Sequence, residues 1–138
     1  MIKIAAVDFD GTIVENRYPE VGKTRPNAKE GMQFLRDQGF SIVIWTCRDQ
    51  DGQREAREFL DARGIPYDYV NENDPRVKSF IPVPPYPKVY ASLYIDDSCW
   101  PPFPGWRFLV DNFEKLGMPH EFDFETFFAD SFWDQGDR

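Results

Sequence analysis

Four aspartates stand in two pairs, and each pair directly follows a short apolar run of the chain. Each run has the length and composition of a buried strand, and parallel strands bring their carboxyl ends to one edge of a sheet. A single aspartate there would only cap a loop, but two pairs would repel one another unless a cation lay among them. Carboxylate oxygens without His or Cys partners favour Mg²⁺ over Zn²⁺, so we predict an Mg²⁺ site at this edge. Its candidate metal ligands are Asp8, Asp10, Asp96 and Asp97.

The apolar residues along the chain predict strands that alternate with helices. The predicted strands span residues 4–7, 41–46, 67–70 and 93–95, of which 67–70 has the weakest pattern. The predicted helices span residues 26–39, 50–64 and 106–116. This alternation indicates βαβ units and a right-handed, doubly wound parallel sheet, and therefore an α/β fold.

The first acidic segment, Asp8-Phe9-Asp10-Gly11-Thr12-Ile13-Val14, resembles the first motif of the haloacid dehalogenase (HAD) superfamily in its phosphatase form. Three later features follow in the order of that family. They are Thr46 at the end of the second strand, Lys88 shortly before the last strand, and the acidic segment Ile95-Asp96-Asp97-Ser98. The resemblance covers roughly residues 2–99. It implies a HAD-like, Rossmannoid three-layer α/β fold with a mainly parallel sheet.

The resemblance implies an Mg²⁺-dependent phosphomonoester hydrolase that works through an aspartyl-phosphate. Asp8 would be the nucleophile, and Asp10 would protonate the leaving oxygen and then take a proton from water. Mg²⁺ would bind Asp8 and the backbone carbonyl of Asp10. We expect Asp97 to be the remaining carboxylate that binds the metal directly. Asp96 would then lie close to the site without binding the metal itself.

The resemblance also implies a set of residues around the phosphoryl group. Thr46 would donate a hydrogen bond to a non-bridging oxygen, and Lys88 would offset negative charge. Lys78, in the same long loop, is the rival for that lysine. Gly11 permits the tight turn after the strand. The residues expected to contact substrate are Gly11, Thr46, Cys47, Arg48 and Lys88.

Arg48 and Cys47 have two interpretations each. Arg48 either grips a substrate phosphate or carboxylate with its fork, or forms a salt bridge with Asp49 or Asp51. Cys47 lies beside the predicted site, but no His stands near it in the sequence, so a packing role is favoured. A disulfide between Cys47 and Cys99 is not expected, because the family topology places the first strand between theirs.

The chain has no room for the cap domain that many HAD enzymes carry. About 15 residues separate Val14 from the first helix, and the other insertion point has only the loop of residues 71–87. Neither segment is long enough to fold independently. We therefore expect a capless enzyme with an open site, in which the proline-rich loop before Lys88 forms one wall and contributes to substrate choice. The substrate itself, a small molecule or an exposed phosphate on a macromolecule, stays open.

Composition limits the remaining possibilities. A chain of 138 residues predicts one domain, with core motifs in 2–99 and a C-terminal helix and phenylalanine-rich tail in 105–138. That tail is expected to pack on the body or to join copies of the chain in a homo-oligomer. The net charge of −8 argues against general nucleic-acid binding. No apolar run approaches a membrane span, and no signal segment or cysteine framework is evident, so we expect a cytoplasmic protein.

Three other functions were weighed against the phosphatase. A dehalogenase is disfavoured because Asp10 is typical of the phosphatase branch. A phospho-accepting signalling domain also uses a parallel sheet with acidic residues, Thr and Lys, but its acceptor follows the strand that here ends in Thr46. A non-catalytic interaction module on the same fold is disfavoured because all four motifs are present.

Overall fold

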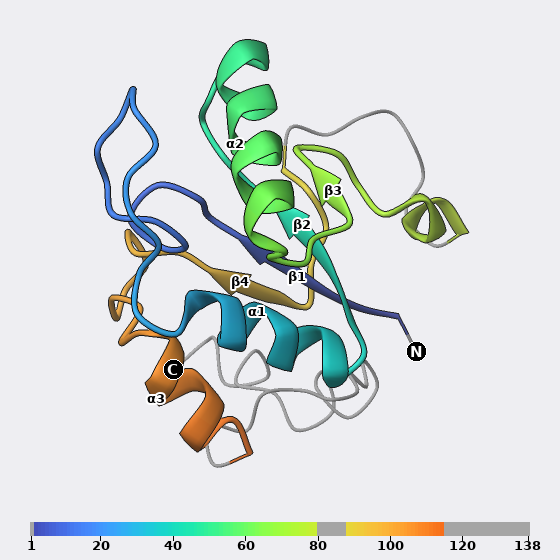
Figure 1. Cartoon of the computed structure of the whole chain (residues 1–138). Helices are drawn as coiled ribbons and strands as arrows, with labels where there is room; N and C mark the ends of the chain where they lie inside the picture. Colours follow the sequence, from blue (N-terminus) through green and yellow to red (C-terminus); the bar gives the residue numbers. More distant parts are fainter. Residues whose placement is uncertain (1, 80–87, 115–138) are drawn as a thin grey trace, which may run out of the picture.

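The computed structural model describes residues 2–79 and 88–114, and it has the predicted alternation of strands and helices (Figure 1). In chain order the elements are β1 (Lys3–Val7), α1 (Ala28–Asp37), β2 (Phe40–Ile44), α2 (Gln50–Arg63), β3 (Tyr69–Val70), the 3-10 helix η1 (Pro75–Ser79), β4 (Leu93–Ile95) and α3 (Trp106–Asn112). Every predicted strand and helix is present. The weakest predicted strand shrinks to the two residues of β3, and the second ends at Ile44 instead of residue 46.

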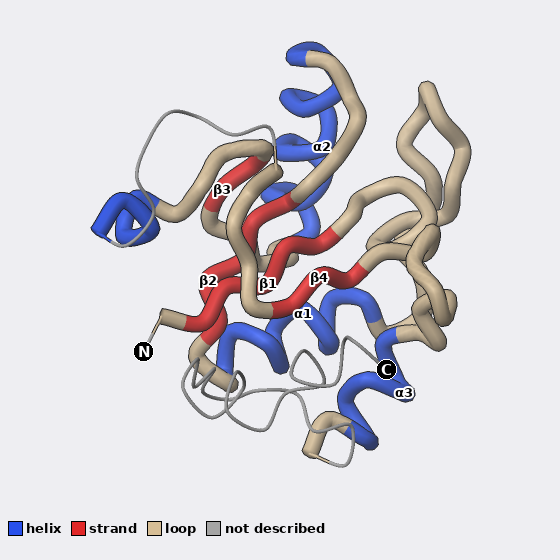
Figure 2. The backbone as a smooth tube through the Cα atoms, turned by 180° about the vertical axis from the view of Figure 1, so that it is seen from behind, coloured by secondary structure: helices blue, strands red, loops and turns tan. Residues whose placement is uncertain are grey.

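The four strands form one parallel sheet in the order β3-β2-β1-β4 (Figure 2). β1 is central, because it pairs with β2 on one side and with β4 on the other. Val7 at the end of β1 lies level with Ile44 of β2 and Ile95 of β4. The segments that follow these three residues therefore leave the sheet at one edge, as the sequence predicted.

Each face of the sheet is covered by a different layer. The main core unites one face of the sheet with α1, α2 and α3, through fully buried side chains such as Val7, Met32 and Leu60. A smaller cluster on the opposite face joins Ile4 and Ala6 to residues from η1 and the segment before β4. The protein thus has a Rossmann-like α/β fold with three layers. Burial of each large apolar side chain contributes about 1.5–3 kcal/mol, which keeps the strand ends in fixed register.

Trp106 links the helical layer to the loop after β1. Its side chain is 1% exposed, and its indole N–H donates to the carbonyl of Thr12 at 2.9 Å. A Cβ atom on Gly31 of α1 would lie 2.3 Å from the indole ring, so glycine is what lets α1 and α3 approach so closely. The hydrogen bond from Trp106 thus fixes the loop that follows Asp8 against α3.

No helix among the described residues is long and apolar enough to cross a membrane. The residues between β1 and α1 form isolated bridges, one of them between Val14 and Thr24, and no element of their own. No cap unit is present at this first insertion point. Residues 80–87 of the second insertion point and residues 115–138, which include the phenylalanine-rich tail, lie outside the described residues, as do the predictions made for them.

Candidate active site

Three carboxylates meet at the carboxyl edge of the sheet. Asp8 follows β1, and Asp96 and Asp97 follow the adjacent strand β4. One oxygen from each carboxylate can be chosen so that all three lie within 4.8 Å of one another. The backbone N–H of Asp8 donates to the carbonyl of Ile95 at 2.9 Å, which locks the two strand ends together. The structure thus brings together three of the four predicted metal ligands. The carboxylate of Asp10 is not in this cluster, because Arg48 binds both of its oxygens.

The electrostatics of this cluster favour a proton or a cation. Burial, then the charge of Asp96, and then a hydrogen bond with Asp97 and its charge together raise the pKa of Asp8 from 3.8 to about 8. The hydroxyl of Thr12, which donates to Asp8 at 3.0 Å, lowers the pKa by a smaller amount. An oxygen-only set of three carboxylates is the ligand type that Mg²⁺ prefers, so the residues present fit that ion.

The turn after Asp8 is shaped by Gly11 and Thr12. Gly11 has φ of 90°, and a Cβ atom on it would lie 2.2 Å from an oxygen of the Asp97 carboxylate. Thr12 is fully buried, and its hydroxyl accepts from the backbone N–H of Asp97 at 2.9 Å while donating to Asp8. Gly11 was predicted for its turn. Its second role, allowing Asp97 to approach, becomes visible only in the structure.

Thr46 lies just beyond β2 and is held by a residue that sequence reasoning did not place in the site. The side chain of Asn71 accepts from the backbone N–H of Thr46 at 2.8 Å and donates to its carbonyl at 2.7 Å. Asn71 follows β3 with φ of 52°, a left-handed conformation that asparagine tolerates better than most residues. The sequence places Asn71 directly after a predicted strand, and therefore at the edge of the sheet, but it does not identify Thr46 as its partner.

Arg48 does not have the partners predicted for it. Its guanidinium binds Asp10, with Nε to Oδ2 and Nη2 to Oδ1 both at 2.7 Å. Asp49 instead caps α2 by accepting from Gly52, and Asp51 pairs with Arg54. The prediction of a salt bridge was right in kind but wrong in partner, because Arg48 turns inward from the edge of the sheet and is 3% exposed.

A pocket of about 590 Å³ unites these residues. Its lining includes the predicted Asp8, Asp10, Thr46, Cys47, Arg48, Asp96 and Asp97. It also includes Asn16, Tyr18 and Ser98. Asn16 and Tyr18 lie in the connection between β1 and α1, after the motif of residues 8–14. No sequence motif singled out these two residues. Ser98 belongs to the acidic fourth segment and could have been inferred from it.

The two candidate lysines lie apart from this lining. The Lys88 ammonium lies 4.8 Å from the centre of the Tyr94 ring, and Lys78 lies in η1. Neither is among the described residues that line the pocket, and no lysine contributes to the pKa of Asp8. Residues 80–87, which connect them, lie outside the described part of the chain. A catalytic role for Lys88, and the loop as a wall of the site, stay predictions.

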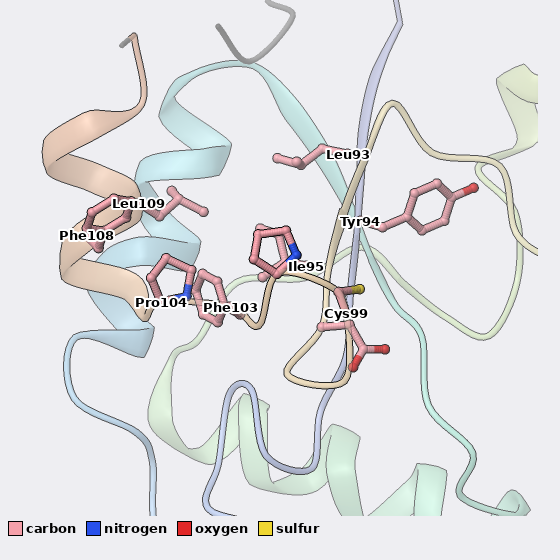
Figure 3. A pocket seen from close by; sticks show the side chains of 10 residues that line it. Leu93, Tyr94, Ile95, Cys99, Phe103, Pro104, Phe108 and Leu109 are labelled. Atoms are coloured by element: carbon pink, nitrogen blue, oxygen red, sulfur yellow. The ribbon is translucent and has the colours of Figure 1, made fainter. Parts of the chain in front are cut away.

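A second, smaller cavity of about 140 Å³ lies between β4 and α3 (Figure 3). Its walls are mostly apolar, with Phe103, Phe108 and Leu109 on one side, and only Asp96 of the acidic cluster reaches it. This cavity has no second carboxylate and is not the candidate site. Cys99 also lines it, and Cys99 and Cys47 are both free thiols, as expected.

Comparisons with known proteins agree with the fold. No protein-family model matches the chain, and no curated protein matches it. A solved structure of a conserved protein from Bacteroides thetaiotaomicron is 31% identical, with a TM-score of 0.72, over 84% of this chain and 93% of the other. This chain belongs to the same family as that bacterial protein. The bacterial protein is described only as conserved, so the shared family comes with no stated activity.

Proposed function

We propose that this protein is an Mg²⁺-dependent phosphomonoester hydrolase of the HAD type that works through an aspartyl-phosphate on Asp8. The observation that carries the proposal is the cluster of Asp8, Asp96 and Asp97 at the ends of two adjacent parallel strands. Asp10 and Thr46 line the same pocket. This arrangement combines an oxygen-only cation site with a nucleophile, an acid/base group and a hydrogen-bond donor.

The cluster also explains why a cation would be needed. Asp8 must be ionised to attack phosphorus, yet burial and its two acidic neighbours hold its pKa near 8 in the metal-free protein. Asp8, Asp96 and Asp97 would hold the ion, which when bound offsets the charge of the carboxylates and of the phosphoryl group. The hydroxyl of Thr12 orients Asp8 by donating a hydrogen bond to it at 3.0 Å.

The reaction would proceed in two chemical steps, in which Asp8 is the nucleophile and Asp10 transfers the protons. In the first, an oxygen of Asp8 bonds to phosphorus, the bond to the leaving oxygen breaks, and Asp10 gives that oxygen a proton. In the second, a water oxygen bonds to phosphorus, its proton passes to Asp10, and Asp8 leaves as a carboxylate. Thr46, held by Asn71, presents its side chain to the pocket as a donor for the phosphoryl oxygens.

The test is hydrolysis of a generic aryl phosphate with Mg²⁺, with chelator and with Zn²⁺. We expect turnover that requires Mg²⁺, disappears with chelator, and is abolished in Asp8→Asn. Asp111→Asn is the matched control, since it makes the same change on α3 in an exposed pair with Arg107. Full activity in metal-free protein, or normal activity of Asp8→Asn, would refute the proposal. Stable phosphorylation by acetyl phosphate without turnover would favour a signalling domain instead.

A further inference from the structure

Four of the five N–H donors of the Arg48 guanidinium form hydrogen bonds within the protein. Nε and Nη2 hold the two oxygens of Asp10, both at 2.7 Å. Nη2 also donates to the carbonyl of Glu20 and Nη1 to that of Pro19, each at 3.0 Å. Nη1 also lies 3.7 Å from the Glu55 carboxylate, an ion-pair distance that is too long for a hydrogen bond. A phosphoryl group entering the pocket would find both N–H groups that face Asp10 already bonded, and at most one N–H of this side chain without a hydrogen bond.

The position of Arg48 is enforced from several sides. Its side chain is 2% exposed, and its guanidinium carbon lies 5.5 Å and 5.2 Å from the ring centres of Phe9 and Tyr18. In α2, a Cβ atom on Gly52 would lie 2.9 Å from the Cβ of Arg48, so glycine leaves room for the stem. A buried guanidinium with four hydrogen bonds to the protein has little freedom to turn toward a ligand.

The contacts of Arg48 also join two parts of the pocket. Asp10, the proposed acid/base group, is 15% exposed at its side chain, and both of its carboxylate oxygens are held by the fork. The carbonyls of Pro19 and Glu20 belong to the connection that carries Asn16 and Tyr18 to the pocket wall. One side chain therefore sets the orientation of Asp10 relative to that wall.

We infer that Arg48 is a positioning residue, which serves the reaction by orienting Asp10 and not by binding the phosphoryl group. This inference rests on the proposed phosphatase function and goes beyond it, because it assigns a role to the one arginine among the described residues that line the pocket. A bidentate fork fixes both the place and the plane of a carboxylate. Acid/base catalysis depends on that geometry, because the proton must pass over a single hydrogen bond.

Two rival roles for Arg48 predict different kinetics. If Arg48 gripped the substrate phosphate, its loss would raise KM for all substrates and would add to the loss of Asp10. If it were only a structural group, its loss would lower the melting temperature and affect all substrates alike. A residue that acts through Asp10 instead lowers kcat, and lowers it most for substrates whose leaving group needs a proton.

The experiment is a double-mutant cycle of Arg48→Gln and Asp10→Asn, with p-nitrophenyl phosphate and an alkyl phosphate as substrates and Mg²⁺ present. We expect each single variant to lower kcat for the alkyl phosphate about 10²–10⁴-fold, with a smaller loss for p-nitrophenyl phosphate. The double variant should fall within about twofold of Asp10→Asn alone, because both changes remove one function. Glu55→Gln is the matched control, since it contacts Arg48 but not Asp10, and it should keep the kinetics of the unchanged protein.

Arg48→Lys keeps the positive charge but lacks the planar guanidinium that binds both oxygens of Asp10. It replaces Arg48→Gln in the cycle if Arg48→Gln does not fold. It should lose part of kcat with the same dependence on the leaving group. Losses that multiply in the double variant, or a rise in KM with kcat retained, would overturn the inference and leave the phosphatase proposal intact. If the unchanged protein hydrolyses neither substrate with Mg²⁺, the proposed function is wrong and the role of Arg48 falls with it.

Discussion

Replacing Asp8 with asparagine should stabilise the metal-free protein near neutral pH. The pKa of Asp8 is raised from 3.8 to about 8 in the folded state, so the folded protein binds more protons than the unfolded chain between those values. Its contribution to stability is therefore complete below about pH 4 and is lost as the pH rises toward 8. Asparagine has nearly the same shape and no charge to desolvate.

The size of the effect follows from the same pKa. One pKa unit corresponds to about 1.4 kcal/mol, so the full rise would cost roughly 5–6 kcal/mol in an unscreened site. Because the Asp8 side chain is partly exposed, solvent screening reduces this to an expected gain for Asp8→Asn of about 2–3 kcal/mol at pH 7.5. Such a gain raises Tm by roughly 5–10 °C in a protein of this size.

The assay is thermal unfolding of both proteins in chelator from pH 4 to pH 8, with Asp111→Asn as the charge-matched control. The gap between Asp8→Asn and the unchanged protein should widen as the pH rises. Addition of Mg²⁺ should then stabilise the unchanged protein and have less effect on Asp8→Asn, since a bound cation favours the ionised cluster. A gap that stays at zero or narrows with rising pH would refute this electrostatic reasoning.

Three further predictions concern Gly11 and Asn71, which shape the site, and the buried carboxylate of Asp74, which does not line it. Gly11→Ala should cost about 1–2 kcal/mol for its positive φ and should weaken Mg²⁺ binding in a calorimetric titration, because its methyl group would displace the Asp97 carboxylate; unchanged Mg²⁺ affinity would contradict this. Asn71→Ala should lower the free energy of unfolding by about 1–3 kcal/mol and reduce kcat, because it leaves the backbone of Thr46 without partners; denaturant unfolding and kinetics measure both, and full activity would count against it. Asp74 is buried and its pKa is lowered to about 2, mainly by a charged hydrogen bond, so it contributes stability above about pH 4 that is lost as the pH falls through 2. Asp74→Asn should reduce the loss of unfolding free energy between about pH 4 and pH 2, measured by denaturant unfolding at each pH. An unchanged loss would show that other carboxyl groups cause it.

Local patterns were sufficient for the elements and for the three carboxylates that meet at the edge of the sheet. Strands β1 and β4 were predicted from short apolar runs, and the aspartates that follow them were predicted to meet. This succeeds because a parallel sheet brings its carboxyl ends to one edge whatever the details of packing. The helix α2 was recognisable from its apolar spacing and from Gly64, which ends it with φ of 63°.

The partners of Arg48 and the role of Asn71 could not be predicted in the same way. Arg48 bonds to a residue 38 positions away, and Asn71 to one 25 positions away. The sequence predicted a salt bridge with Asp49 or Asp51, which are neighbours of Arg48 in the chain. In the structure the Arg48 side chain is buried at the edge of the sheet and binds Asp10 instead. Tyr18 and Asn16 reach the pocket because the connection after β1 folds back through the bridge between Val14 and Thr24.

The sequence by itself therefore determined the order of the elements, the parallel sheet and the type of ligand atoms at its edge, because hydrophobic periodicity and turn residues act over a few positions. Only the tertiary structure decided which oxygen atoms are close enough to share a cation, which carboxylate the arginine holds, and which side chain supports Thr46. These contacts depend on how separate segments pack against one another, and no local pattern in the chain encodes that packing.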